Sequence, residues 1–280
     1  MFIPFKKMHG AGNDFIVIKE EDIPDNVELQ QLARSCCHRN FGIGADGLLV
    51  VAASQAADVK MIYYNSDGSI ANMCGNGIRC FSKFVFDEGL ANKENFKVET
   101  LAGIYRVDVK IANHKVEFVK VNMGRMYFKP EEIPVVHDGP HFIKQKIHGG
   151  GKVFEATTVL MGVPHTVIFL DKLSDDDVRN FGPIIENMEI FPHKTNVNFV
   201  EVVSRGLVHV KTWERGAGFT LACGTGVTSV CGVAHYLDLV DSEVEVIIDG
   251  GRLQVIIKDD GTMDMEGPAE DICEGKYYYK

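Results

Sequence analysis

The stretch Ala71-Asn72-Met73-Cys74-Gly75-Asn76-Gly77-Ile78-Arg79-Cys80 returns in altered form as Leu221-Ala222-Cys223-Gly224-Thr225-Gly226-Val227. Both copies read Cys-Gly-x-Gly, and their cysteines are 223 − 74 = 149 residues apart. Apolar residues at helical spacing follow each copy, so each cysteine is predicted to stand at the start of a helix. Backbone N–H groups without intrahelical partners and a positive dipole end favour a thiolate or a bound anion there.

Other features repeat in the same order. Asn65 lies nine residues before Cys74, and Glu214 lies nine residues before Cys223. The segment 8–18 has a looser counterpart at 161–170, and 97–103 has one at 244–251. A repeat this long indicates two copies of a whole domain rather than a solenoid. We therefore expect an N-terminal half over 1–122, joined by a C-terminal tail at about 268–280, and a C-terminal half over 123–267.

Composition and charge narrow the class of protein. The chain has 280 residues, 45% hydrophobic and 24% charged, which is ordinary for a globular protein of two domains. The net charge of −10 argues against a nucleic-acid partner. No apolar segment reaches the roughly 18 residues needed to span a bilayer, and the N-terminus lacks the apolar core of a signal peptide. We expect no membrane partner and a cytoplasmic location, where seven cysteines need not form disulfides.

The expected elements indicate an α+β fold. Strand-like runs outnumber helices in each half and do not alternate regularly with them, so mostly antiparallel sheets are predicted rather than a doubly wound sheet. One helix is predicted from a cap at Asp25 or Asn26 to about Asn40, and another begins after Ser174. The letters of 42–47 match G-x-G-x-x-G, but that segment follows a helix and precedes a strand, the wrong context for a dinucleotide site.

The two cysteines have a chemical interpretation. Inversion of a stereocentre by proton exchange needs a base on one face of the carbon and an acid on the other, and a thiolate and a thiol can fill these roles. The exposed N–H groups of Gly75, Asn76, Gly224 and Thr225 could hold a substrate carboxylate and stabilise the carbanion.

Six segments together resemble the diaminopimelate epimerase family, a group of cofactor-independent two-cysteine enzymes. They are Met8-His9-Gly10-Ala11-Gly12-Asn13-Asp14-Phe15, Gly44-Ala45-Asp46-Gly47, 65–80, 161–165, 191–199 and 214–226. The resemblance covers nearly the whole chain. It implies two pseudo-symmetric domains, each a mostly antiparallel sheet or barrel around a central helix. It also implies epimerisation of LL- and meso-2,6-diaminopimelate for lysine and peptidoglycan synthesis, without pyridoxal phosphate or metal.

The resemblance also implies roles for individual residues. Cys74 and Cys223 would be the acid/base pair, with His165 and Glu214 supporting the proton transfers. The residues expected to hold the small amino-acid substrate are Asn13, Asn65, Asn76, Asn196, Glu214 and Arg215, together with Gly75, Gly224 and Thr225. Arg215 would make a two-pronged contact to the distal carboxylate. A homodimer is expected from the same resemblance.

Some residues depart from the family pattern and leave alternatives open. Val163 stands where many members have Asn, Gly47 where some have Gln, and Phe219 replaces a common Glu. A related two-cysteine racemase acting on another amino acid, such as histidine, is one alternative, and a non-catalytic amino-acid binding protein is another. Each thiol alone would more often be a buried packing residue. A metal site built on Cys36, Cys37, His38, Cys74 and Cys80 lacks paired C-x-x-C spacing.

Overall fold

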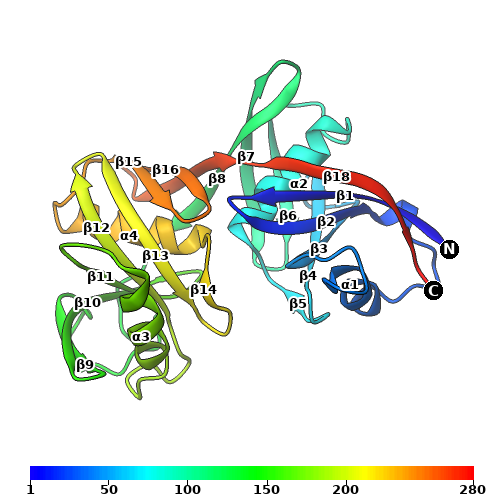
Figure 1. Ribbon diagram of the computed structural model, residues 1–280. Coiled ribbons are helices and arrows are strands. Elements are labelled where there is room, and N and C mark those ends of the chain that lie inside the picture. The colour runs from blue at the N-terminus through cyan, green and yellow to red at the C-terminus, as the bar shows by residue number, and fades with distance from the viewer. The chain divides into compact units, whose positions relative to one another are not determined.

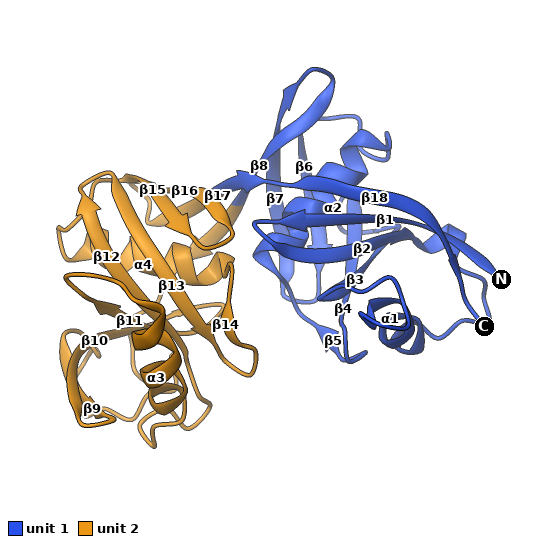
Figure 2. Ribbon diagram, in the orientation of Figure 1, with its two compact units in different colours: residues 1–121, 266–280 blue, residues 122–265 orange.

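The computed structural model describes residues 1–280, which divide into two compact units. The first comprises residues 1–121 and 266–280, and the second comprises residues 122–265 (Figure 2). The chain passes between the units within two strands, β8 (Lys115–Arg125) and β17 (Thr262–Pro268). The last strand, β18 (Glu270–Tyr278), pairs antiparallel with β1 (Phe2–Gly10) in the first unit.

The first unit is a mixed sheet with two α-helices (Figure 1). Its remaining elements are β2 (Asn13–Lys19), a short 3-10 helix (Glu20–Asp22), α1 (Leu29–Cys37), β3 (Gly47–Ala52), β4 (Val59–Asn65), β5 (Ile70–Ala71), α2 (Gly75–Asp87), β6 (Asn95–Thr100) and β7 (Gly103–Ala112). Most neighbouring strands pair antiparallel, but β2 pairs parallel with β3, and β4 with β6.

The second unit repeats this order. It contains β9 (Gln145–Gly149), β10 (Lys152–Met161), β11 (Val163–Phe169), α3 (Asp175–Glu186), β12 (Asn196–Ser204), β13 (Leu207–Glu214), β14 (Gly218–Thr220), α4 (Gly224–Tyr236), β15 (Glu243–Ile248) and β16 (Gly251–Ile257). The parallel pairs are again β11 with β12 and β13 with β15, and a helix again separates the first parallel pair in sequence. The prediction of an α+β fold with two pseudo-symmetric domains is confirmed.

A central helix organises each unit. Every residue of α2 from Gly75 to Val85 is buried, and α2 contacts β1, β2, β3 and β7. In the second unit α4 is buried over nearly its whole length and contacts β10, β11, β12, β13 and β16. The small and apolar residues of α4 suit a helix buried on nearly all sides, whereas α2 also buries Arg79 and Lys83, whose charged groups are hydrogen-bonded. The two repeated cysteines immediately precede these two helices.

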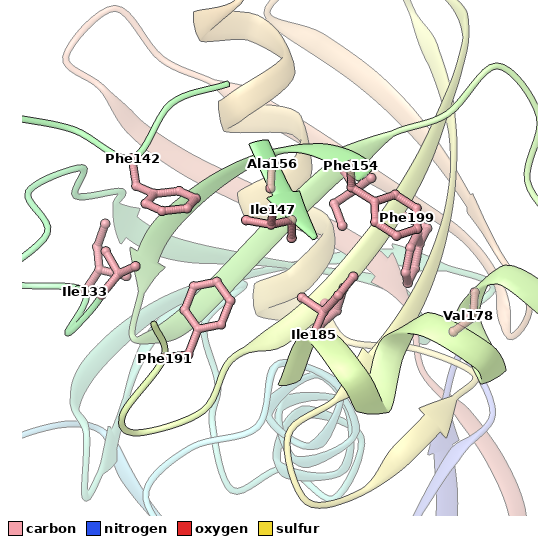
Figure 3. Close-up of a cluster of buried hydrophobic side chains, with 12 residues drawn as sticks. Ile133, Phe142, Ile147, Phe154, Ala156, Val178, Ile185, Phe191 and Phe199 are labelled. Carbon is pink, nitrogen blue, oxygen red and sulfur yellow. The ribbon is translucent and has the colours of Figure 1, made fainter. Parts of the chain in front are cut away.

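Separate apolar cores lie beneath the outer helices α1 and α3. In the second unit, Phe154, Ile185 and Phe199 pack together in a cluster that extends to Ile133, Phe142 and Phe191 (Figure 3). In the first unit, Leu32, Ala33 and Cys36 of α1 pack on β2 and β3. These side chains recur at the helical spacing expected of one buried face.

The predicted bounds of α1 were wrong at both ends. The helix begins at Leu29 after Glu28, with no side-chain cap, because the backbone before it forms a turn in which Val27 N–H donates to Pro24 O. It ends at Cys37 rather than near Asn40, since the N–H groups of Ile43 and Gly44 satisfy the Cys36 carbonyl. The glycine-rich segment 42–47 therefore closes a helix C-terminus, and these N–H groups do not face a phosphate. The short strands β5, β9 and β14 were not predicted.

Candidate active site

Cys74 stands at the N-cap of α2 with an extended backbone, as its sequence predicted. Its Sγ accepts a hydrogen bond from Gly77 N–H at 3.4 Å, one of the N–H groups that the helix leaves unpaired. Its S–H in turn donates to the side-chain oxygen of Asn13, at 3.6 Å. The same sulfur thus has a donor that suits the thiolate and an acceptor that suits the thiol.

Asn13 and Asn76 lie together beside Cys74. Asn13 begins β2, and Asn76 is the second residue of α2 and is buried. The Asn76 Nδ2 donates to Asn13 Oδ1 at 3.3 Å, while its own oxygen accepts from Arg79 Nη1 at 3.0 Å. The structure therefore brings Cys74, Asn13 and Asn76 into one hydrogen-bonded group.

An ionic cluster lies behind Asn13, and the sequence analysis did not predict it. Asp46 Oδ2 accepts from Asn13 Nδ2 at 2.6 Å, and Arg39 Nη2 bridges Asp46 and Asp14 at 2.7 and 2.9 Å. Burial alone would raise the pKa of Asp14, but Arg39 and the nearby Lys7 lower it below its ordinary value. The only sequence signal for Asp46 was its place in the segment Gly44-Ala45-Asp46-Gly47.

Cys223 stands at the N-cap of α4, where its thiol is buried. Its Sγ lies 3.6 Å from Thr225 Oγ1. Burial and, next, the carboxylate of Glu214 raise the pKa of Cys223 well above its ordinary value. The resting form of Cys223 at neutral pH is therefore the thiol, although Thr225 and Gly226 N–H partly oppose the shift.

His165 reaches Cys223 through Thr225. The His165 Nε2 is 3.0 Å from Thr225 Oγ1, and its Nδ1 is 3.3 Å from Asn198 Nδ2. Because Asn198 Oδ1 accepts from Thr212 Oγ1, the Asn198 amide turns its NH2 toward His165. Nδ1 must then be the acceptor and Nε2–H the donor to Thr225. Burial, and to a smaller extent the charge of Arg215, lowers the pKa of His165 to about 3, so the ring is neutral.

Glu214, Arg215 and Asn196 meet where β13 ends and β12 begins. Glu214 Oε1 accepts from Thr220 Oγ1 at 2.5 Å, and Asn196 Oδ1 accepts the Arg215 backbone N–H at 2.9 Å. The guanidinium of Arg215 is exposed and donates to His193 O at 2.9 Å. Asn196 thus holds the turn that carries Arg215.

Asn65, at the end of β4, was also predicted to hold the substrate, and its side chain is hydrogen-bonded within its own turn. Its Nδ2 donates to Ser69 Oγ at 3.0 Å, across its own turn. Asn65 pairs in register with Gly47, where a Cβ would lie 2.5 Å from the Tyr63 ring and 2.8 Å from Tyr64 O. The Tyr63 ring therefore occupies the space that a longer side chain at position 47 would need.

The two cysteine sites differ in what lies beneath their helices. The parallel pairs place Phe15 beside Gly47 and His165 beside Asn196, so Phe15 and His165 hold matching positions. A Cβ at Gly77 would lie 3.4 Å from the Phe15 ring, whereas a Cβ at Gly226 would lie 2.6 Å from Asn198 Oδ1. The first cysteine helix rests on apolar side chains and the second on polar ones.

Roles for Asn198 and Thr212 at the site were also not predicted from the sequence. Asn198 falls within the segment 191–199, but its alternation with apolar neighbours gave no sign that its side chain meets His165. The structure brings no three His, Cys, Asp or Glu side chains into an arrangement that could hold a metal ion. None of the helices has the length and apolar character to cross a membrane.

Comparison with known proteins adds independent information. The family model described as diaminopimelate epimerase matches residues 5–129 and 157–272. The diaminopimelate epimerase of Alkaliphilus metalliredigens is 55% identical over 277 residues, which cover 99% of this chain and 98% of that protein. That of Clostridium perfringens is 48% identical, over 98% of this chain and 99% of its own.

Solved structures with little sequence identity share the fold. A hydroxyproline epimerase from Agrobacterium vitis superposes with a TM-score of 0.72 at 13% identity, covering 98% of this chain and 92% of its own. A PhzF-family phenazine biosynthesis protein from Bacillus anthracis has a TM-score of 0.72 at 16% identity, with both chains fully covered. Given the family match and the identity to two curated members over nearly the whole chain, this chain belongs to the diaminopimelate epimerase family.

Proposed function

We propose that this chain interconverts LL- and meso-2,6-diaminopimelate by two-base proton transfer, with Cys74 and Cys223 as the acid/base pair. Family membership supports the isomerase activity and the amino-acid substrate. The observation that carries the mechanism is that both cysteines hold the same place in a repeated topology, at the N-cap of a buried central helix. The chemistry requires one thiol at each face of the substrate α-carbon.

Of the two cysteines, Cys223 has surroundings that clearly favour the thiol, the acid form. In the direction where Cys223 acts as the acid, its raised pKa supplies the thiol form, and the Thr225 hydroxyl stabilises the thiolate left behind. Neutral His165 donates to Thr225, which leaves the Thr225 hydroxyl proton free to turn toward the sulfur. Glu214 would take or return the thiol proton when the roles reverse. His165 thus acts as a hydrogen-bond donor through Nε2–H and not as a general acid, since the imidazole ring is uncharged at neutral pH.

The carbanion must also be stabilised. If the α-proton is about ten pK units less acidic than a thiol, the difference is about 14 kcal/mol. The backbone N–H groups at the starts of α2 and α4, which belong to Gly75, Asn76, Gly224 and Thr225, would hold the substrate carboxylate that shares the charge. Fixed donors of this kind can contribute about 3 kcal/mol each.

The other polar residues would recognise the rest of the substrate. Asn13, Asn65 and Asn76 would contribute from the first unit, and Asn196, Glu214 and Arg215 from the second. The exposed guanidinium of Arg215, carried on a turn that Asn196 fixes, is suited to a two-pronged bond to the distal carboxylate. No cofactor is required for this chemistry, because the thiols and N–H groups supply both proton transfer and charge stabilisation.

We also propose that the enzyme works in the cytoplasm as a homodimer. All seven cysteines are free thiols, which suits a reducing compartment. Nearly all of β18 is exposed, and Phe2, Ile272 and Tyr278 present apolar side chains on β1 and β18. Light scattering of the wild-type chain and of Ile272→Lys should give a dimer for the first and a shift toward monomer for the second. A monomeric wild type would contradict the proposal.

Proton NMR of the reduced protein in D2O tests the substrate. We expect LL-diaminopimelate to gain deuterium at an α-carbon as that carbon inverts, while L-histidine in a parallel sample stays unlabelled. Exchange into histidine alone would keep the chemistry but make this chain a histidine racemase. Binding of diaminopimelate without any exchange would instead indicate a binding protein.

A further inference from the structure

Asp46 lies between a loop and β3, and its carboxylate faces hydrogen-bond donors on both sides. Its Oδ2 accepts from Asn13 Nδ2 at 2.6 Å and from Asp14 N–H at 3.2 Å, and its Oδ1 accepts from Arg39 Nη2 at 2.7 Å. An ionised carboxylate can only accept. The Asn13 amide must therefore turn its NH2 toward Asp46 and its oxygen the other way, toward Cys74 and Asn76.

The contacts of Asn76 on the other side of Asn13 agree with this orientation. Arg79 is buried, and a guanidinium can only donate, so the Asn76 oxygen faces Arg79 at 3.0 Å. The Asn76 NH2 then points to Asn13 Oδ1, at 3.3 Å. The Asn13 and Asn76 amides lie between the Asp46 carboxylate, which can only accept, and the Arg79 guanidinium, which can only donate. Only one orientation of each amide satisfies both groups.

We infer that Asp46 is a positioning residue for Cys74: it acts through Asn13 to keep an amide oxygen, rather than an amide NH2, beside the thiol. The inference rests on the proposed acid/base role of Cys74. An oxygen at this place accepts the S–H of Cys74, as the 3.6 Å contact shows. An NH2 there would instead donate to the sulfur and favour the thiolate. The orientation of one amide therefore sets the balance between the two protonation states on which the reaction depends.

Asp46→Asn changes this orientation with little change in shape. The new amide offers one oxygen and one NH2 to two sides that both hold donors. Charged Arg39 makes the stronger hydrogen bond and claims the oxygen. The NH2 then faces Asn13 Nδ2 across a contact of 2.6 Å, which is closer than the 3.3 Å between Asn13 and Asn76, so the Asn13 amide is driven to turn over despite its hydrogen bond to Asn76.

Alkylation of Cys74 by iodoacetamide, followed by mass spectrometry of its peptide across a pH series, reads out the effect. We expect the pH of half-maximal alkylation to fall by about one unit in Asp46→Asn, because a donor replaces an acceptor at the sulfur. We also expect kcat/KM for diaminopimelate to fall about tenfold, the loss of one such hydrogen bond in the transition state. The other charged or titratable groups near the sulfur or behind Asn13 are unchanged in the variant; they are Arg79, the Cys80 thiol, Asp14, Lys7 and Arg39.

Two further variants separate positioning from a structural role of the ionic cluster. Arg39→Ala removes the ion pair with Asp46, and that with Asp14, but leaves the Asp46 carboxylate toward Asn13, so the alkylation midpoint should stay at the wild-type pH. In the double variant Arg39→Ala/Asp46→Asn, Arg39 no longer competes for the oxygen of the introduced amide. That oxygen turns to Asn13 and Asp14 N–H, so the midpoint should return toward that of the wild type.

Asp58→Asn is the matched control, because Asp58 accepts from Lys97 N–H at 2.7 Å in a turn of the same unit. It should change neither midpoint nor activity. An unchanged midpoint in Asp46→Asn, or equal shifts in Arg39→Ala and Asp46→Asn, would overturn the inference. Cys74→Ala distinguishes the two levels of failure: an active Cys74→Ala contradicts the proposed mechanism, whereas an inactive one with an unshifted Asp46→Asn contradicts positioning alone.

Discussion

At the scale of single residues, His165 shows how burial sets a chemical role. The imidazole is fully buried between Thr225 and Asn198, neither of which carries a charge. Desolvation disfavours the imidazolium, and the pKa falls to about 3. An imidazole ring that stays neutral can orient Thr225 through one fixed tautomer, but it cannot act as a general acid at neutral pH.

This shift predicts how stability depends on pH. His165 binds a proton in the unfolded chain near pH 6.5 but not in the folded chain until about pH 3, so its contribution is complete above pH 6.5 and is lost as the pH falls. Between pH 7.5 and 5, the free energy of unfolding of the wild type should fall by about 2 kcal/mol more than that of His165→Gln. Urea unfolding of both proteins across this range measures the difference, and parallel curves would refute the prediction.

Sequence reasoning at this scale found the residues that carry motifs but not those that orient them. Cys74, Asn13 and Asn76 were predicted from the repeat and the family pattern, and the structure joins them by hydrogen bonds. Asp46 approaches Asn13 only because β2 and β3 pair in parallel, with Phe15 opposite Gly47. A contact set by strand register cannot be predicted from the spacing of letters along the chain.

At the scale of elements, α2 and α4 begin with the same Cys-Gly-x-Gly sequence but leave different amounts of space around its second glycine. A Cβ on Gly77 would meet Cys74 Cβ, Phe15 and Leu49 at 3.3 to 3.5 Å, whereas one on Gly226 would lie 2.6 Å from Asn198 Oδ1 and 3.2 Å from Cys223 Sγ. We expect Gly226→Ala to lower kcat/KM by at least about tenfold and Gly77→Ala to lower it less. Alanine favours helices, so a propensity loss cannot explain either effect. Equal losses in steady-state assays would count against this difference.

The N-cap of α3 is expected to contribute to stability but not to catalysis. Ser174 accepts Asp177 N–H at 3.1 Å as a helix N-cap, as its sequence predicted. Ser174→Ala should lower the free energy of unfolding by about 1 kcal/mol and leave activity unchanged. Ser242→Ala, which alters an exposed serine in a loop, should change neither. If thermal or urea denaturation shows no loss in Ser174→Ala, the cap contributes nothing measurable.

Helix starts marked by a cap residue or by the Cys-Gly-x-Gly repeat were predicted, whereas the start of α1 was not. The caps at Ser174 and Cys74 gave local signals, and α2 ends where Gly89 takes a positive φ of 70°. The ends of α1 depended instead on a preceding turn and on a loop that returns to its last carbonyls. The strands β5 and β14 are only two and three residues long, too short for an alternating pattern to reveal.

At the scale of the whole molecule, one topology is used twice with different surroundings for the reactive groups. The repeat places a cysteine at the same point of each unit, yet Gly226, in the turn after Cys223, lies against Asn198, whereas Gly77, in the turn after Cys74, lies against Phe15 and Leu49. Polar control of Cys74 comes instead from Asn13 at its side. Two chemically alike thiols in different surroundings suit LL- and meso-diaminopimelate, which differ in configuration at one carbon only.

Solvent exchange with single-cysteine variants tests the two-base reaction most directly. Wild type, Cys74→Ala, Cys223→Ala and the exposed-thiol control Cys273→Ala are each incubated with LL-diaminopimelate in D2O under reducing conditions. We predict inversion with deuterium incorporation at wild-type rates in Cys273→Ala, and a loss of at least about 10²-fold in both Cys74→Ala and Cys223→Ala, since each removes a general acid or base. Inversion at the wild-type rate in either of these two variants would contradict the proposed mechanism.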